Sequence, residues 1–241
     1  MRAIILAAGR GSRMGEATAS QPKCLTEIFG KPLIKWQIEA FNAAGIKNIS
    51  VVTGYKHEKL EGYGSRQVYN SRWAETQMVA SLMCASDWLG SAPCIVSYSD
   101  IFYESSAITS LRGSDAPLAI TYDPNWLELW KSRFEDPLVD AETFEIDAFG
   151  NLRSIGQRPE TIKEIDGQYM GLLKFTPQAF REISLLLRSV SSEIWDSIHM
   201  TGLLQKVIKA ESLPIEAIPY YGTWGEVDSQ NDRDVYESMG F

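Results

Sequence analysis

The sequence is poor in cysteine, histidine and long apolar runs. Its 241 residues contain three cysteines and two histidines, and an odd number of widely spaced cysteines argues against a disulfide framework. A zinc centre is also disfavoured, because zinc sites draw mainly on these two residue types. No stretch approaches the roughly eighteen consecutive apolar residues of a membrane span, and Gly9 and Arg10 interrupt the first apolar run too early for a signal peptide. We therefore expect a cytoplasmic protein with no membrane partner.

Basic residues are in the minority. The chain has 23 Lys and Arg against 31 Asp and Glu, a formal net charge of -8. Nucleic acid is disfavoured as a partner, since binding to its backbone depends on clustered Lys and Arg. Hydrophobic residues make up 44% of the chain, which is typical of a globular protein. The length suits one large or two small domains, and in the absence of a clear linker we expect one domain over residues 1–241.

The N-terminal segment joins a strand pattern to a glycine-rich loop. The run AIILAA at residues 3–8 is typical of a buried strand in a parallel sheet. Gly9 and Gly11 behind it let backbone N–H groups approach an anion, and Arg13 and Lys23 add the positive charge that a triphosphate needs. The spacing fits neither a P-loop nor a dinucleotide-binding fingerprint. For the two glycines alone, an ordinary strand-to-helix turn is the better interpretation.

Strand and helix patterns alternate along the rest of the chain. Apolar spacing and boundary residues predict helices over 32–44, 78–89 and 231–238 and strands over 48–53 and 94–99. Such alternation predicts an α/β fold with a doubly wound, mostly parallel (mixed) central sheet and helices on both faces. In sheets of this kind, ligands bind beyond the carboxyl ends of the strands.

The string LAAGxGSRM followed by PK resembles the signature of nucleotidyltransferases that join an NTP to a phosphorylated small molecule. The resemblance implies a Rossmann-like nucleotidyltransferase fold, with Arg13 neutralising the leaving pyrophosphate and Lys23 reaching the α-phosphate. Segments 69–82 and 122–142 are similar to those of phosphocholine, phosphonate and phosphoglutamine cytidylyltransferases of surface-polysaccharide pathways. Gln77 stands where most members have asparagine, a departure that leaves an amide in place.

The resemblance implies a nucleotide site in the first half of the chain, residues 1–120. Its expected members are Leu6, Ala7, Ala8, Gly9, Gly11, Ser12, Arg13, Lys23, Gly54, Tyr55, Asn70, Thr76, Met78 and Ser81. Alternatives stay open for some of them. A plain turn explains Gly54 and Tyr55 equally well, Thr76 also suits a helix N-cap, and Met78 also suits a core position.

Two aspartates are candidate ligands of Mg²⁺. Asp100 follows the predicted strand 94–99, and Asp228 precedes the predicted last helix. Nucleotidyl transfer needs a divalent cation to offset phosphate charge, and Mg²⁺ is usually held by one or two carboxylates and substrate oxygens. Each aspartate alone would fit a turn or a helix cap. The positions that the family uses favour the metal interpretation, with Lys23, Arg13, Asp100 and Asp228 as the catalytic group.

The second half, residues 121–241, is expected to bind the acceptor and to supply the second metal ligand. The candidates are Tyr98, Trp126, Arg133, Glu142, Tyr169, Thr201, Trp224 and Glu226. Aromatic walls would hold a quaternary amine by cation–π attraction, although the same aromatics also suit the core. Arg133 would grip a phosphate or carboxylate in two bonds, or else form a surface ion pair. Glu142 and Glu226 would meet an amino group or remain solvated.

The sequence thus predicts a metal-dependent cytidylyltransferase. It would transfer CMP from CTP to a small phosphorylated or phosphonate acceptor, such as phosphocholine, aminoethylphosphonate or phosphoglutamine, and release pyrophosphate. A sugar-1-phosphate nucleotidyltransferase using UTP or dTTP, a guanylyl- or methylerythritol-type enzyme, and a non-catalytic nucleotide-sensing domain are the alternatives. CTP and the acceptor are the expected partners, and a homodimer is left open.

Overall fold

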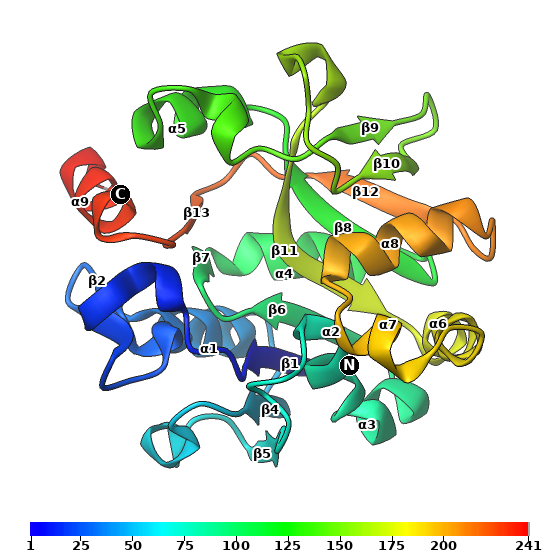
Figure 1. Ribbon diagram of the computed structural model, residues 1–241, viewed down its shortest axis with the longest axis horizontal. Coiled ribbons are helices and arrows are strands. Elements are labelled where there is room, and N and C mark those ends of the chain that lie inside the picture. Colours follow the sequence, from blue (N-terminus) through cyan, green and yellow to red (C-terminus); the bar gives the residue numbers. More distant parts are fainter. Residues whose placement is uncertain (241) are drawn as a thin grey trace.

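A seven-stranded sheet forms the centre of the computed structural model, which describes residues 1–240 apart from the side chains of Arg13, Glu16, Ala17 and Ser192 (Figure 1). The strand order is β12-β8-β11-β6-β1-β4-β5. The strands are β1 (Arg2–Ala7), β4 (Ile49–Thr53), β5 (Arg66–Tyr69), β6 (Cys94–Tyr98), β8 (Leu118–Asp123), β11 (Gln168–Phe175) and β12 (Ile215–Pro219). Strand β11 is antiparallel to both neighbours, and the other pairs are parallel. This mixed, mostly parallel sheet confirms the predicted fold class.

Three two-stranded pairs stand beside the main sheet. They are β2 (Glu27–Ile28) with β3 (Lys31–Pro32), β7 (Ile101–Tyr103) with β13 (Trp224–Glu226), and β9 (Phe144–Ile146) with β10 (Leu152–Ile155). The β7–β13 pair joins the middle of the chain to its C-terminal end. It therefore brings together segments that the sequence separates by more than a hundred residues, and Figure 1 shows β13 leading into the C-terminal helix.

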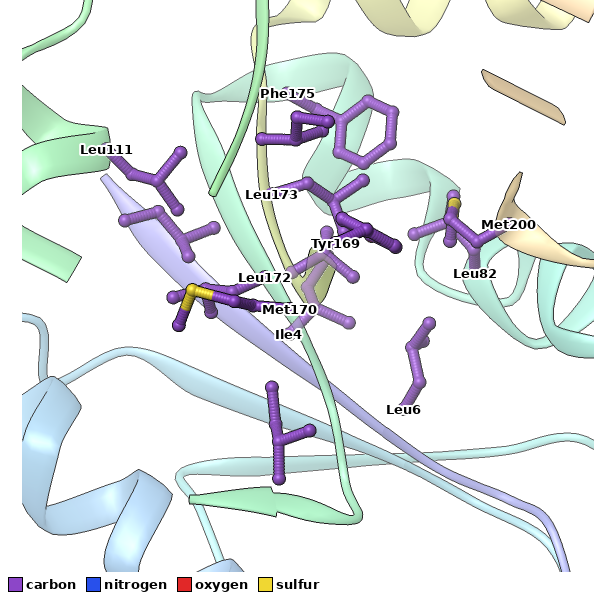
Figure 2. Packing of buried hydrophobic residues seen from close by; sticks show 14 of the residues in the cluster. Ile4, Leu6, Leu82, Leu111, Tyr169, Met170, Leu172, Leu173, Phe175 and Met200 are labelled. Carbon is purple, nitrogen blue, oxygen red and sulfur yellow. The ribbon is translucent and has the colours of Figure 1, made fainter. Parts of the chain in front are cut away.

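The helices divide into groups by their contacts with one another. They are α1 (Leu33–Ala43), α2 (Met78–Met83), α3 (Ser86–Ser91), α4 (Ser105–Gly113), α5 (Trp126–Arg133), α6 (Pro177–Arg188), α7 (Ser192–Asp196), α8 (Met200–Lys209) and α9 (Gln230–Met239). Helix α1 contacts α4, and α5 contacts α9. In the remaining group, α8 contacts α2 and α6, α6 also contacts α3, and α2 also contacts α7. In Figure 2, Leu111 of α4 and Leu82 of α2 approach the central strands from opposite sides, with Leu172 and Leu173 of β11 between them. No helix within residues 1–240 has both the length and the apolar character needed to cross a membrane.

The elements predicted from the sequence are present, with one difference. The predicted helix over 78–89 is two short helices, because the backbone at Ala85 (φ -100°, ψ 23°) leaves the helical region between them. Leu82, Ala85 and Leu89 are all fully buried. The apolar spacing therefore predicted the buried face of this segment correctly, but it did not predict the break between α2 and α3. At the C-terminus, Ser229 caps α9 and exchanges hydrogen bonds with Asp232.

Candidate active site

Three carboxylates meet where the two halves of the chain join. Asp100 lies between β6 and β7, and Glu226 ends β13, where it pairs with Ile101 of β7. The backbone N–H of Val227 donates to the carbonyl of Asp100 at 2.9 Å. This ladder places carboxylate oxygens of Asp100, Glu226 and Asp228 within 4.8 Å of one another. The β7–β13 pairing thus brings together the two aspartates that the sequence predicted to act as a pair.

Lys23 is buried against this carboxylate cluster. Its Nζ donates to Asp100 Oδ2 at 2.7 Å and also to Asp228 Oδ1. Burial on its own lowers the pKa of Lys23, but the charges of Asp100 and Asp228 outweigh burial and raise the pKa above its usual value. Gly11 makes room for the lysine stem, since a Cβ at this position (φ +71°) would lie 2.7 Å from the Cβ of Lys23. The glycine-rich loop therefore positions the lysine.

The carboxylate cluster has the donor chemistry of a divalent-cation site. All of its ligand atoms are oxygens, which Mg²⁺ prefers. Asp100 Oδ1 is buried, and no described group donates a hydrogen bond to it, so this oxygen has an unused lone pair. Burial, reinforced by the charges of Asp228 and Asp100, raises the pKa of Glu226 well above its usual value. The three carboxylates therefore repel one another, and a bound divalent cation would relieve this repulsion.

A cavity of about 310 Å³ opens at the carboxyl end of β1. It is lined by most of the residues predicted to bind nucleotide, namely Leu6, Ala8, Gly9, Gly11, Ser12, Lys23, Thr76, Met78 and Ser81. Asp100 is also in its wall, so the cavity reaches the carboxylate cluster. The backbone of Gly9 and Gly11 and the ammonium group of Lys23 therefore line the same cavity. Such a lining suits a polyphosphate.

Other predicted nucleotide residues are absent from the described lining of this cavity and lie behind it. Asn70 is buried and donates through Nδ2 to Thr76 Oγ1 at 3.2 Å and Ser81 Oγ at 3.1 Å. A Cβ on Gly54 would lie 2.5 Å from the carbonyl oxygen of Ala8, so this glycine permits close packing. The Asn70 side chain and the Gly54 backbone thus support lining residues.

Tyr55 and Ala7 are likewise absent from the described lining of the first cavity. The backbone N–H of Tyr55 donates to Ala8 at 2.9 Å, and Ala7 is buried at the end of β1. The side chain of Arg13 lies outside the described residues. Thr76 does not cap α2, because the capping position is Gln77 and Thr76 Oγ1 donates instead to the carbonyl of Arg72 at 2.8 Å.

A second cavity, of about 530 Å³, adjoins the first and shares Met78, Asp100 and His199 with it. Five residues predicted to bind the acceptor line it, namely Tyr98, Glu142, Tyr169, Thr201 and Glu226. The two tyrosine rings meet edge to face, with centroids 5.8 Å apart. Both cavities reach the carboxylate cluster, so ligands in the two cavities would meet there.

The second cavity carries charges of both signs. Glu142 lines it, and burial raises the pKa of this carboxyl, partly offset by a hydrogen bond with Thr201. Gln168 Oε1 is buried and receives no hydrogen bond from a described group. Lys206 and His199 also belong to the lining. The cavity therefore offers a carboxylate and an amide oxygen to a cationic group and a lysine to an anionic one.

Three residues predicted to bind the acceptor are absent from the described lining of the second cavity. Trp126 and Trp224 are 4% exposed core residues, and each packs on Trp130 at a centroid distance of 6.2 Å. Trp224 Nε1 donates to Asp123 Oδ2 at 3.0 Å. The Arg133 side chain is completely buried and pairs with Asp232. These large side chains pack inside the protein and are absent from the described lining of the second cavity.

Sequence reasoning missed several lining residues. Trp73, Gln77, Ser99 and His199 line the first cavity, and Asp140, Gln168, Lys206 and His199 line the second. His199 is the least predictable, because it enters from the end of a segment whose backbone is anchored on α2. The N–H groups of Gln77 and Val79 donate to the carbonyls of Asp196 and Ile198 at 2.7 and 3.4 Å. Such long-range pairing leaves no local sequence signal.

The fold and the two cavities define a nucleotide-dependent transferase, and comparison with known proteins agrees. The chain belongs to the family of MobA-like NTP transferase domains, whose model matches residues 3–129. A CTP:phosphoglutamine cytidylyltransferase of Campylobacter jejuni subsp. jejuni serotype O:2 is 35% identical, with 98% of each chain covered. The choline-phosphate cytidylyltransferase of Streptococcus pneumoniae is 38% identical, over 38% of this chain and 42% of its own. The resemblance predicted from the sequence is thereby confirmed.

Solved structures show the same architecture. The structure of a CTP:phosphocholine cytidylyltransferase from Streptococcus pneumoniae matches with a TM-score of 0.73 at 22% identity, and it covers 99% of this chain and 98% of the other. At this identity the match establishes the fold. The agreement extends beyond residue 129, so the second half of the chain also follows the nucleotidyltransferase architecture.

Proposed function

We propose that this protein is a cytidylyltransferase that transfers CMP from CTP to a small phosphorylated acceptor and releases pyrophosphate. The observation that carries the proposal is the meeting of two cavities at one carboxylate cluster, with Lys23 and Asp100 in the wall of the first and Glu142 and Asp100 in the wall of the second. The full-length similarity to a cytidylyltransferase supports the choice of CTP. The first cavity is the nucleotide site in this proposal, and the second is the acceptor site.

Asp100, Asp228 and Glu226 are the proposed ligands of Mg²⁺. When bound by these residues, Mg²⁺ would supply positive charge that offsets the negative charge of the phosphates and of the departing pyrophosphate. Lys23 contributes a second, fixed positive charge near the α-phosphate. Gly9, Gly11 and Ser12 direct backbone groups toward the β- and γ-phosphates, with Arg13 as the proposed partner of the pyrophosphate.

The transfer itself is a single displacement at the α-phosphorus. An oxygen of the acceptor phosphate forms a new bond to this atom while the bond to the bridging oxygen of the β-phosphate breaks, and that oxygen leaves with the pyrophosphate. The attacking oxygen is already an anion at neutral pH, so no residue has to remove a proton. The protein accelerates the step by holding both reactants in line and by offsetting charge.

The acceptor cavity favours a phosphorylated molecule that carries an amino group. Glu142 and the orphan oxygen of Gln168 are suited to bind an ammonium group, and Lys206 is suited to bind a carboxylate. A phosphorylated amino acid has all three charged groups. Phosphoglutamine is the proposed acceptor, because the relative that this chain matches from end to end is named for that substrate.

Pyrophosphate release measures the proposed reaction directly. We would test CTP, UTP, dTTP, ATP and GTP with Mg²⁺ against phosphoglutamine, phosphocholine, 2-aminoethylphosphonate and glucose 1-phosphate. Release with CTP and phosphoglutamine is the expected result. Release only with UTP or dTTP and a sugar phosphate would replace the substrate assignment. Nucleotide binding without release under any combination would support a nucleotide-sensing domain instead.

A further inference from the structure

A buried ion pair lies behind the carboxylate cluster. Arg133 ends α5 and Asp232 lies in the first turn of α9, and their side chains are 0% and 2% exposed. Arg133 Nε donates to Asp232 Oδ1 at 2.8 Å, and the guanidinium lies 4.7 Å from the centroid of the Trp130 ring. Its Nη1 and Nη2 are buried without a hydrogen-bond partner among the described residues. Such a pair contributes little to folding, because desolvation offsets much of its attraction.

The other oxygen of Asp232 holds the backbone that carries a proposed metal ligand. Oδ2 accepts from the N–H of Asp228 at 2.9 Å, from the N–H of Ser229 at 2.8 Å and from Ser229 Oγ at 2.9 Å. A single carboxylate thus joins α5 to the turn that presents Asp228. Three hydrogen bonds to one anionic oxygen fix that turn firmly, since charge-assisted bonds are the strong ones.

We propose that Arg133 and Asp232 are positioning residues that hold Asp228 in the metal-binding cluster. Arg133 fixes the orientation of the Asp232 carboxylate, and Asp232 fixes the backbone at Asp228. The carboxylate of Asp228 then lies beside Asp100 and Glu226 before any cation arrives. This inference rests on the proposed metal-dependent function, and it gives a role to the arginine that the sequence had suggested for the acceptor.

The proposal predicts that the protein loses metal affinity when Asp232 Oδ2, the oxygen that accepts these hydrogen bonds, is removed. Residues that orient metal ligands typically contribute 10- to 100-fold to affinity. We would measure Mn²⁺ binding to the nucleotide-free protein by electron paramagnetic resonance, in which the free ion gives the signal. Asp232→Ala should bind Mn²⁺ at least 10-fold more weakly than the unchanged protein. Asp234→Ala is the matched control, because this exposed residue lies on the same helix and accepts from Gln230.

Asp232→Ala leaves Arg133 buried with an unpaired charge, so weaker Mn²⁺ binding by this variant would also follow from a failure to fold. Two double variants avoid this problem, because both lack the buried charges. Arg133→Met with Asp232→Asn keeps an oxygen that accepts from the N–H groups of residues 228 and 229, whereas Arg133→Met with Asp232→Ala does not. We expect similar melting temperatures, with Mn²⁺ binding close to normal in the asparagine variant and at least 10-fold weaker in the alanine variant.

The outcomes separate this inference from the proposed function. Equal Mn²⁺ affinity in the two double variants, with measurable binding in the unchanged protein, would overturn the positioning role and leave the metal site standing. If the unchanged protein did not bind Mn²⁺ at all, the proposed metal site itself would fail. A difference between the asparagine and alanine variants at equal stability would establish the positioning role.

Discussion

Lys23 Nζ lies 2.7 Å from Asp100 Oδ2, an ion pair between the short helical turn Lys23–Leu25 and a strand end 77 residues away. The same ammonium group contacts Asp228, so one lysine offsets two carboxylates of the cluster. The charge of the cluster is therefore partly offset by a cation from the protein itself. With substrate bound, the carboxylates would bind a divalent cation. Lys23 would then contact a nucleotide phosphate instead.

Lys23→Met should reduce kcat more than it raises the KM for CTP. The reason is that the ammonium charge is worth most when charge shifts from the α-phosphate to the leaving pyrophosphate. Loss of one such charge costs on the order of 100-fold in rate. Steady-state kinetics with varied CTP measure both constants. A variant with normal kcat and a raised KM would make Lys23 a ground-state binding residue instead.

Asp100→Asn and Asp228→Asn should each nearly abolish turnover while the fold persists. Each change removes one anionic ligand from the cluster but keeps the volume of the side chain. The check combines pyrophosphate release with the rise in melting temperature that Mg²⁺ produces. The unchanged protein should be stabilised by Mg²⁺, because a ligand bound only to the folded state raises its stability, and both variants should lose this effect. Normal turnover in both would exclude them as metal ligands.

The sequence predicted the parts of this site that depend on local pattern. The strand at residues 3–8, the loop with Gly11 and the acids at two strand ends are each readable from neighbouring residues. Parallel-strand topology then explains why Asp100 and Lys23 face the same cleft.

What the sequence did not reveal depends on contacts between distant residues. Arg133 was open to interpretation as an acceptor ligand because its partner, Asp232, is 99 residues away. The sequence did not distinguish pocket aromatics from core aromatics, since Tyr98 and Trp224 are both bulky aromatics at a strand terminus, Tyr98 at the end of β6 and Trp224 at the start of β13. Gly171 shows the same limit. Its φ of +76° and the Tyr98 ring, 2.7 Å from where its Cβ would be, explain the residue only after folding.

Trp224→Phe distinguishes a core role from an acceptor role. The change removes the donor to Asp123 Oδ2, whose pKa burial already raises. Leaving a buried acceptor without its donor costs about 1–3 kcal/mol, so we expect that loss in the free energy of unfolding measured with urea. The KM for the acceptor should stay within a factor of two of normal. A large rise in KM at unchanged stability would return Trp224 to the acceptor site.

Glu142→Gln should weaken acceptor binding in a pH-dependent manner. The neutral amide keeps the shape of the side chain but loses its attraction for an ammonium group. A charge-assisted bond is worth about 1.5–3 kcal/mol, or roughly 10- to 100-fold in KM.

Burial raises the pKa of Glu142, so protonation of this carboxylate in the unchanged enzyme begins at a higher pH than for an exposed glutamate. As pH falls, the carboxyl becomes neutral and the KM of the unchanged enzyme rises toward that of the glutamine variant. The ratio of the two KM values should therefore fall toward one in acid. Protonation of the acceptor phosphate affects both enzymes equally and cancels in this ratio, so a ratio that did not change with pH would show that Glu142 does not meet a cationic group.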